Sequence, residues 1–196
     1  MLHRAVKSRG TQMRDAEATR ARILAAAVGE FAEHGLAGSR VDRIAKNAKS
    51  NVRMIYAYFG GKSSLFDAAL ETALRKLAHD VPPNPDDLPG WAGEVFDHHQ
   101  RHPDILRLSM WARLERPSAL AEPGDVYAEK ADAVRAATPE PLTPVDVLIF
   151  IYAIAQAWQL SPTGLTSLDG ISDDPRRIAA HRRAVVAAVQ GILPRS

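Results

Sequence analysis

The 196-residue chain contains no cysteine, and this absence excludes several kinds of site at once. Without thiols the protein has no disulfides, no cysteine nucleophile, no iron-sulfur cluster and no cysteine-based zinc site. A chain of this kind is expected in the reducing cytoplasm. The basic N-terminus has no apolar segment of the kind found in signal peptides, which also predicts a cytoplasmic protein.

Long apolar runs are also scarce. Residues 147–155 are all apolar, but nine residues fall well short of the roughly 20 needed to cross a bilayer. This run therefore predicts a helix that is buried on most of its sides within a folded domain. The overall composition, with 46% hydrophobic and 24% charged residues, is that of an ordinary globular protein.

Positive charge is concentrated at one end of the chain. Residues 1–62 contain 12 Lys and Arg against 5 Asp and Glu, whereas the remaining residues have an acidic excess. A basic segment joined to an acidic one favours a polyanionic partner, although basic N-terminal segments are also common without one. Charge alone leaves both readings open.

Apolar residues recur at helical spacing along the whole chain, which predicts an all-α fold. We expect a three-helix, helix-turn-helix head over residues 1–62, ordered from about residue 17. A linking helix over residues 63–79 should join it to a helical-bundle body over residues 63–196. The proline-rich segment 81–90 should be a connection. Body helices are predicted at residues 91–102, 103–115, 118–137, 144–160 and 175–193.

Capping signals mark where several of these helices begin and end. Gly35 is suited to the left-handed conformation that ends the first helix. Ser39 and Asp42 have the spacing of a capping box for the second helix, and Asn51 is a suitable N-cap for the third. Thr143 begins a second capping box before the helix at 144–160.

Segment 18–70 contains an ordered set of residues, namely Arg20, Ile23, Ala26, Ala27, Phe31, Gly35, Ile44, Ala45, Ala48, Tyr56, Phe59, Lys62 and Leu65. Their order resembles the DNA-binding head of the tetracycline-repressor (TetR) family of bacterial transcriptional regulators. The resemblance implies a homodimeric repressor that binds a double-stranded DNA operator and is released by a small-molecule effector. In the turn, however, this chain has Lys49-Ser50-Asn51 where the family usually has Gly-Val-Ser.

The third helix is the candidate recognition helix, whose N-terminal residues would face base edges in the major groove. Val52, Arg53 and Met54 occupy those positions, and an arginine there can bind guanine through two hydrogen bonds. Tyr58 and Phe59 are expected to be core residues. The resemblance further implies phosphate contacts by Tyr56, Lys62, Ser39 and Arg40, and the turn residues Lys49 and Asn51 complete the predicted DNA-binding set.

The body has two predicted functions, and for its apolar residues ordinary core packing is the alternative. The resemblance implies a pocket for an apolar or aromatic effector, and the two last helices should form the dimer interface. The pocket candidates are Phe96, Met110, Trp111, Leu114, Tyr127, Phe150, Gln156 and Trp158. The interface candidates are Ile178, Val185, Val186, Val189 and Ile192.

No catalytic constellation is found, so the chain is predicted not to be an enzyme and to need no cofactor or metal. Gly61-Lys62-Ser63 lacks the earlier glycine of a phosphate-binding loop. The cluster His98-His99-x-x-His102 could offer two imidazoles on one helical face, but it lacks the further ligands that zinc requires. The competing hypothesis is a helical enzyme or ligand-binding protein that resembles the family only in its head.

Overall fold

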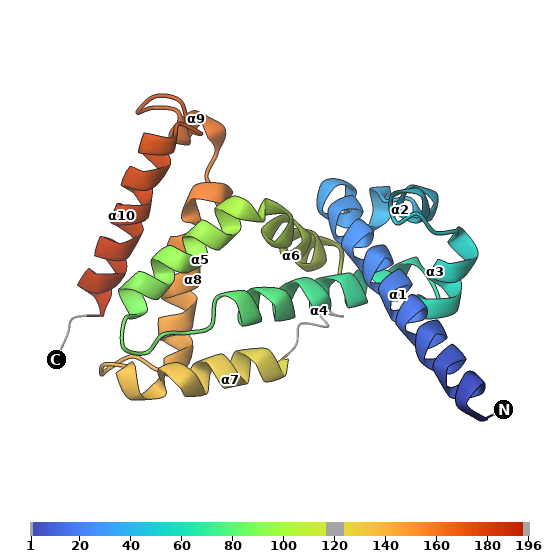
Figure 1. Ribbon diagram of the computed structural model, residues 1–196. Helices are drawn as coiled ribbons and strands as arrows, with labels where there is room; N and C mark the ends of the chain where they lie inside the picture. Colours follow the sequence, from blue (N-terminus) through green and yellow to red (C-terminus); the bar gives the residue numbers. More distant parts are fainter. Residues whose placement is uncertain (1, 117–123, 194–196) are drawn as a thin grey trace. The chain divides into compact units, whose positions relative to one another are not determined.

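The computed structural model describes residues 2–116 and 124–193, with side chains from Met13 onward, and all regular structure in these residues is helical (Figure 1). This confirms the predicted all-α class. The elements are α1 (Leu2–Gly38), α2 (Val41–Asn47), α3 (Val52–Phe59), α4 (Lys62–Asp80), α5 (Leu88–Arg101), α6 (Pro103–Glu115), α7 (Gly124–Val134), the 3-10 helix η1 (Arg135–Ala137), α8 (Pro144–Leu160), α9 (Thr163–Thr166) and α10 (Pro175–Ile192).

Most predicted helices are present, with differences at their ends. α1 begins at Leu2 and not near residue 17, and the short α9 was not predicted. α5 begins at Leu88, within the predicted connection, because the Asp87 side chain accepts a hydrogen bond from the Gly90 amide. The predicted helix 118–137 is α7 followed by η1, and its first residues lie outside the described part of the chain.

The chain forms two compact units. The head unit comprises Met1–Leu74 and Asp104–Glu122, and the body unit comprises Arg75–Pro103 and Pro123–Ser196. The predicted head, residues 1–62, lies wholly inside the head unit. That unit also takes in the first part of α4 and nearly all of α6, which the sequence assigned to the body.

The head core is built on the apolar stripe of α1. Ile23 and Phe31 of this stripe are fully buried, and they pack with Ile44 of α2 and Ile55 of α3. The rings of Phe31 and Phe66 meet edge to face with their centroids 5.0 Å apart. Phe66 belongs to α4, so four helices, α1 to α4, contribute to one core. This core fixes α3 against α1.

α6 packs against the head and forms hydrogen bonds with it where α1 is interrupted. Gly35 has a φ of 67° and interrupts α1 at the predicted position, although helical structure resumes as far as Gly38, and a Cβ at Gly35 would lie 2.9 Å from the Trp111 ring. The Trp111 indole donates to the Ala32 carbonyl at 3.3 Å, and the Glu115 carboxylate accepts from the Leu36 amide. α6 thus supplies acceptors and packing to the end of α1.

The body core lies between α5, α8 and α10, which are in mutual contact, and Figure 1 shows α5 crossing α8. The absence of a side chain at Gly93 lets α5 approach Arg182 and Val186 of α10 closely. The predicted capping box of α8 is confirmed, since Thr143 and Asp146 exchange hydrogen bonds. None of the helices in the described ranges has both the length and the hydropathy of a membrane span.

Candidate nucleic-acid interface

The helix-turn-helix consists of α2, a turn at residues 48–51 and α3. The Asn51 side chain accepts a hydrogen bond from the Met54 amide at 3.0 Å and so caps α3, as predicted. Ile55 and Phe59 face the core, whereas Arg53 is exposed, Val52 is 38% exposed and Tyr56 is 54% exposed. α3 therefore presents a continuous accessible face that begins at its N-terminus.

Met54 is less accessible than Val52 and Arg53. It is partly buried and packs against the head core. The prediction that Met54 contacts bases stays a prediction, and Val52 and Arg53 are the more exposed candidate base-contacting side chains. Tyr58 packs against the core and Phe59 is buried in it, as expected.

The turn contains a backbone conformation that its sequence does not favour. Lys49 has a φ of 50°, the left-handed conformation that the missing family glycine would adopt without cost. A left-handed conformation costs a non-glycine residue about 1–2 kcal/mol. The docking of α3 is therefore retained at the expense of local backbone strain, and the exposed Lys49 side chain adds a positive charge beside α3.

We expect Lys49→Gly to be more stable than Lys49→Ala by about 1 kcal/mol, because both remove the charge but only glycine relieves the left-handed strain. The measurement is the free energy of unfolding in urea. Ala57→Gly, in the exposed middle of α3, provides the opposite control and should destabilise the protein by about 1 kcal/mol. Equal stabilities of the two Lys49 variants would contradict the strain.

A buried ion pair joins α1 to α2. Glu30 is only 6% exposed, and its carboxylate accepts hydrogen bonds from the Arg43 guanidinium and from the Arg40 backbone amide, the latter at 2.8 Å. Burial alone would raise the pKa of Glu30, but these hydrogen bonds lower it below its usual value. The sequence pattern did not predict this contact.

Because of Glu30, the predicted capping box at Ser39 does not form. α2 begins one residue later, with Arg40 as its N-cap residue, and the Ser39 hydroxyl donates to the Leu36 carbonyl at 3.0 Å. Ser39 is buried, so the prediction that its side chain contacts a phosphate is corrected. Arg40 is exposed, but its guanidinium pairs with Asp42 at 2.9 Å.

Lys62 has a structural role that the sequence did not predict. Its ammonium donates to the carbonyls of Ala37 and Ser39, at 3.3 Å and 3.0 Å, and so ties the start of α4 to the segment before α2. An ammonium has three donors, and the third remains for the predicted phosphate contact. Lys62→Ala would therefore perturb the head as well as any phosphate contact.

The cations that remain for DNA follow from these pairings. Among the described residues of α2, the turn and α3, three exposed cations have no anionic partner, namely Lys46, Lys49 and Arg53. Lys46 was not predicted as a DNA contact. Its exposure in the last turn of α2 is visible only once the helix is placed against its core.

The predicted effector residues are divided between the two units. Met110, Trp111 and Leu114 belong to the head unit, where Met110 and Leu114 are exposed and Trp111 packs on α1. The prediction that Trp111 lines a body pocket is corrected, because its ring and its indole donor are used in the head. The other five, all in the body unit, are Phe96, Tyr127, Phe150, Gln156 and Trp158.

Two of the predicted effector residues in the body unit, Phe96 and Trp158, both lie close to His181. Phe96 is fully buried and its ring lies 5.6 Å from that of His181, which in turn lies 4.6 Å from Trp158. Gln156 contacts the His99 ring nitrogen at 3.2 Å. Phe150 is partly exposed on α8.

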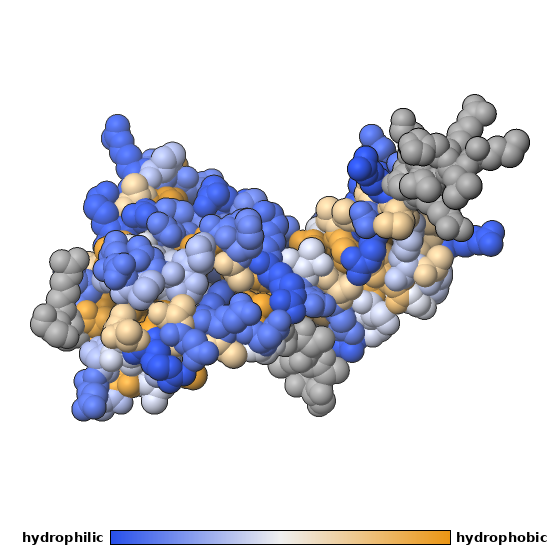
Figure 2. All heavy atoms as spheres, turned by 60° about the horizontal axis from the view of Figure 1, so that its bottom comes forward, coloured by the Kyte–Doolittle hydropathy of each residue, from blue (hydrophilic) through white to orange (hydrophobic). Residues whose placement is uncertain are grey.

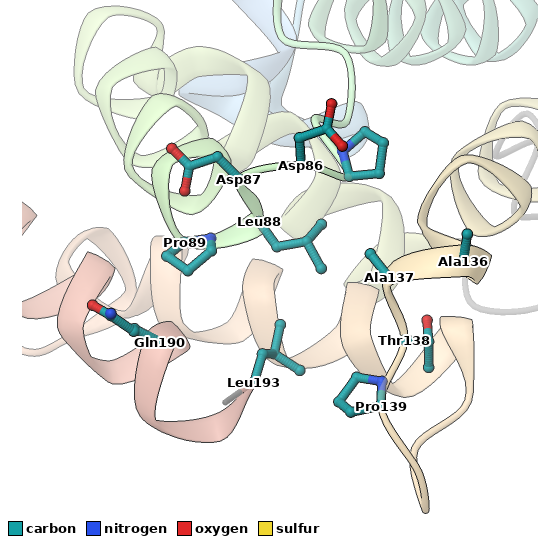
Figure 3. Close-up of a pocket in the computed structure, with 11 residues that line it drawn as sticks. Asp86, Asp87, Leu88, Pro89, Ala136, Ala137, Thr138, Pro139, Gln190 and Leu193 are labelled. Carbon is teal, nitrogen blue, oxygen red and sulfur yellow. The ribbon is translucent and has the colours of Figure 1, made fainter. Parts of the chain in front are cut away.

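A cavity of about 420 Å³ opens at another place in the body unit (Figure 3). None of the eight predicted effector residues lines it. Its walls come from the segment before α5, from η1 and the residues after it, and from the end of α10. The lining residues are Pro85, Asp86, Asp87, Leu88, Pro89, Ala136, Ala137, Thr138, Pro139, Gln190 and Leu193.

The predicted interface residues of α10 also separate into two groups. Val185 and Val189 are 2% and 1% exposed and belong to the body core, so they have no surface left to bury against a second subunit. The prediction for these two residues is therefore corrected. Ile178 and Val186 are partly buried, and Ile192 is exposed.

A capped, solvent-accessible recognition helix held on a helical core, with unpaired cations beside it, defines a helix-turn-helix DNA-binding protein. Family models match both parts of the chain. The model described as "Bacterial regulatory proteins, tetR family" matches residues 23–69, and "Tetracyclin repressor-like, C-terminal domain" matches residues 87–190. The chain belongs to the TetR family of bacterial regulatory proteins, which are DNA-binding transcriptional regulators and not enzymes.

Individual relatives agree with this assignment. The HTH-type transcriptional repressor SCO4008 of Streptomyces coelicolor is 49% identical over 126 residues, which cover 62% of this chain and 66% of that protein. The HTH-type transcriptional repressor NicS of Pseudomonas putida is 37% identical over 106 residues, half of each chain. The chain thus matches about two thirds and one half of these repressors' lengths.

Solved structures extend the similarity to nearly the whole chain. The transcriptional regulator SCO4942 of Streptomyces coelicolor is 40% identical with a TM-score of 0.78, covering 91% of this chain and 99% of that one. A TetR-family regulator from Rhodococcus sp. shares the fold at 20% identity, with a TM-score of 0.62 and coverage of 90% and 99%. The likeness includes the body, so the competing hypothesis of a family-like head on an unrelated protein is wrong.

Proposed function

We propose that this protein is a cytoplasmic, homodimeric repressor that binds a pseudo-palindromic operator and is released from it by a small molecule. The observation that carries the DNA-binding part is the exposed face of α3, where Arg53 has neither a carboxylate partner nor a core contact among the described residues. An arginine at this position can bind guanine O6 and N7, which contributes about 1–3 kcal/mol of discrimination.

Lys46 and Lys49 have a different role in this proposal. They flank the turn and offer exposed charges without a fixed hydrogen-bonding partner, which suits phosphate oxygens better than base edges. Each phosphate contact releases counterions, so affinity should fall steeply as salt is added.

The dimer is assigned to a face of α8. Val145, Ile149, Ala153 and Ala157 follow one another at four-residue spacing and are all exposed. Ile192 adds an exposed apolar side chain from α10. Figure 2 shows that hydrophobic residues reach the surface of the body among hydrophilic ones. Two copies of α8 and α10 would cover this face by forming a four-helix bundle around a two-fold axis.

Release by a ligand requires that the body and the recognition helices be coupled. α4 is continuous from the head unit into the body unit, and α6 carries the Trp111 and Glu115 contacts to α1. A ligand that prefers one arrangement of these helices would shift the spacing of the two heads by its differential affinity. Operator and ligand must then weaken each other's binding by the same factor.

Selection of bound duplexes from a random pool tests the proposed function. We expect an enriched pseudo-palindrome whose half-sites are related by the protein's two-fold axis, with centres about 34–36 Å or a related spacing apart. Binding that enriches no motif, or a single asymmetric site, would contradict a dimeric sequence-specific regulator.

A further inference from the structure

Lys130 of α7 is a buried cation in the body unit. It is 5% exposed, and its ammonium donates to the Tyr152 hydroxyl at 2.5 Å and lies 5.2 Å from the centre of that ring. Among the described residues, no carboxylate forms an ion pair with it. A buried charge without a partner of opposite charge is costly, and proteins seldom keep one without a use.

The neighbours of Lys130 cannot neutralise it. Burial raises the pKa of Tyr152, so its phenol stays protonated and uncharged at neutral pH. Burial likewise lowers the pKa of the nearby His99 to about 4, so that imidazole is neutral as well. Burial lowers the pKa of Lys130 itself only to about 8, which leaves the ammonium charged at pH 7.

Other buried polar atoms in the same unit also lack partners. His99 is 1% exposed, and while its Nε2 contacts Gln156, its Nδ1 has no hydrogen-bond partner among the described residues. Both amide atoms of Gln159 and the Nε2 of His181 are unpartnered in the same sense. Buried side chains are normally satisfied, so the unpartnered Nδ1 of His99, whose ring interacts electrostatically with Lys130, points to a missing polar group.

The aromatic residues near Lys130 indicate what the remainder of the missing molecule is, beyond its polar group. The Trp91 ring meets the Tyr152 ring edge to face at 6.0 Å, so an aromatic surface lies next to the hydroxyl that Lys130 binds. Trp158, two residues beyond Gln156 on α8, packs instead against His181 and lies under the Arg177 guanidinium. The site therefore combines one positive charge, neutral hydrogen-bonding groups and aromatic rings.

We propose that the body binds a small organic anion, an aromatic or arylalkyl monocarboxylate, whose carboxylate pairs with Lys130 and accepts a hydrogen bond from His99. Two of the three ammonium donors of Lys130 are not used by Tyr152 and are available for the carboxylate oxygens. This inference rests on the proposed ligand-released repressor and names the chemical class of its effector, which the sequence predicted only as apolar or aromatic.

The test uses the full chain, with benzoate, phenylacetate and 1-naphthoate as probes and their neutral amides and benzylamine as controls. Lys130→Met removes the charge but keeps the volume, and Lys76→Met removes an exposed body lysine as the matched control. Thermal unfolding is measured for each protein with each probe, and operator affinity is measured by fluorescence anisotropy on the DNA obtained by selection.

We expect at least one carboxylate to raise the melting temperature of the wild type and of Lys76→Met, and its amide to have no effect. Lys130→Met should weaken carboxylate binding about 10- to 100-fold, as expected for the loss of a charged hydrogen bond. Without any probe, Lys130→Met should melt at a higher temperature than the wild type, because it removes an uncompensated buried charge.

The inference is overturned if no carboxylate shifts the wild type, if the shift is equal in Lys130→Met, or if benzylamine or the amides act as well as the carboxylates. A lower melting temperature of ligand-free Lys130→Met would also overturn it, because the cation would then be satisfied by the protein. A carboxylate that binds through Lys130 without changing operator affinity supports the site and contradicts release by this ligand. If the wild type selects no operator from the random pool, the proposed repressor function is contradicted, but the carboxylate site is not.

Discussion

We expect Glu30→Ala to destabilise the head by about 3 kcal/mol, because it leaves Arg43 without its partner and removes the acceptor of the Arg40 amide. Arg43 is partly exposed and can regain water, which places the expected loss at the low end for a buried ion pair. Urea unfolding measures the free energy. Hydrogen exchange in residues 20–70 locates the loss in the head.

Glu33→Ala is the matched control, since Glu33 is one turn along α1, exposed, and 3.8 Å from His34. It should change stability by less than about 0.5 kcal/mol, as surface substitutions usually do. The lowered pKa of Glu30 further predicts that this stability is present above the pKa of an unfolded glutamate and is lost as the pH falls through the folded value. A Glu30→Ala protein as stable as Glu33→Ala would show that the ion pair does not hold α2 in place.

The second large effect is expected from the exposed face of α8. Ile149 is 55% exposed, and Ile149→Asp should give a monomer that remains folded but binds the operator about 100-fold or more weakly, because one head alone engages a half-site. Sedimentation gives the oligomeric state, circular dichroism the fold and anisotropy the affinity.

Leu114→Asp is the matched control for this experiment, because Leu114 is an exposed apolar residue of α6 in the head unit. It should leave the dimer intact. Val185→Asp is not a suitable probe, since Val185 is a core residue and the variant should unfold the body. An Ile149→Asp protein that sediments as a dimer would place the interface elsewhere.

Local signals in the sequence predicted the parts of the fold that depend on neighbours along the chain. Asn51 and Thr143 cap their helices as expected, and Gly35 breaks α1, because each of these effects involves residues within one turn. Lys49, in the turn where the family usually has Gly-Val-Ser, has a left-handed backbone conformation.

The predictions that were wrong share one cause, because each depended on contacts between residues far apart in the sequence. Ser39 has the spacing of a cap, but its hydroxyl donates to the Leu36 carbonyl, and the amide of Arg40 donates to Glu30, ten residues earlier. The periodicity of α6 shows that Trp111 faces a core without showing which core, and Gly35 places it in the head. Val185 and Val189 form the same apolar stripe whether a partner helix belongs to this subunit or to a second one.

The central claim is that α3 recognises base sequence through Arg53 while Lys46 and Lys49 bind the DNA backbone. Affinities of the wild type, Arg53→Ala and Lys46→Ala for every single-base variant of the selected operator test it most directly. We predict that Arg53→Ala loses discrimination of about 1–3 kcal/mol at one base pair in each half-site. Lys46→Ala should weaken binding to all operator variants equally and reduce the slope of log affinity against log salt concentration by about 1 per half-site. Uniform weakening by Arg53→Ala, with every base preference retained, would contradict the claim.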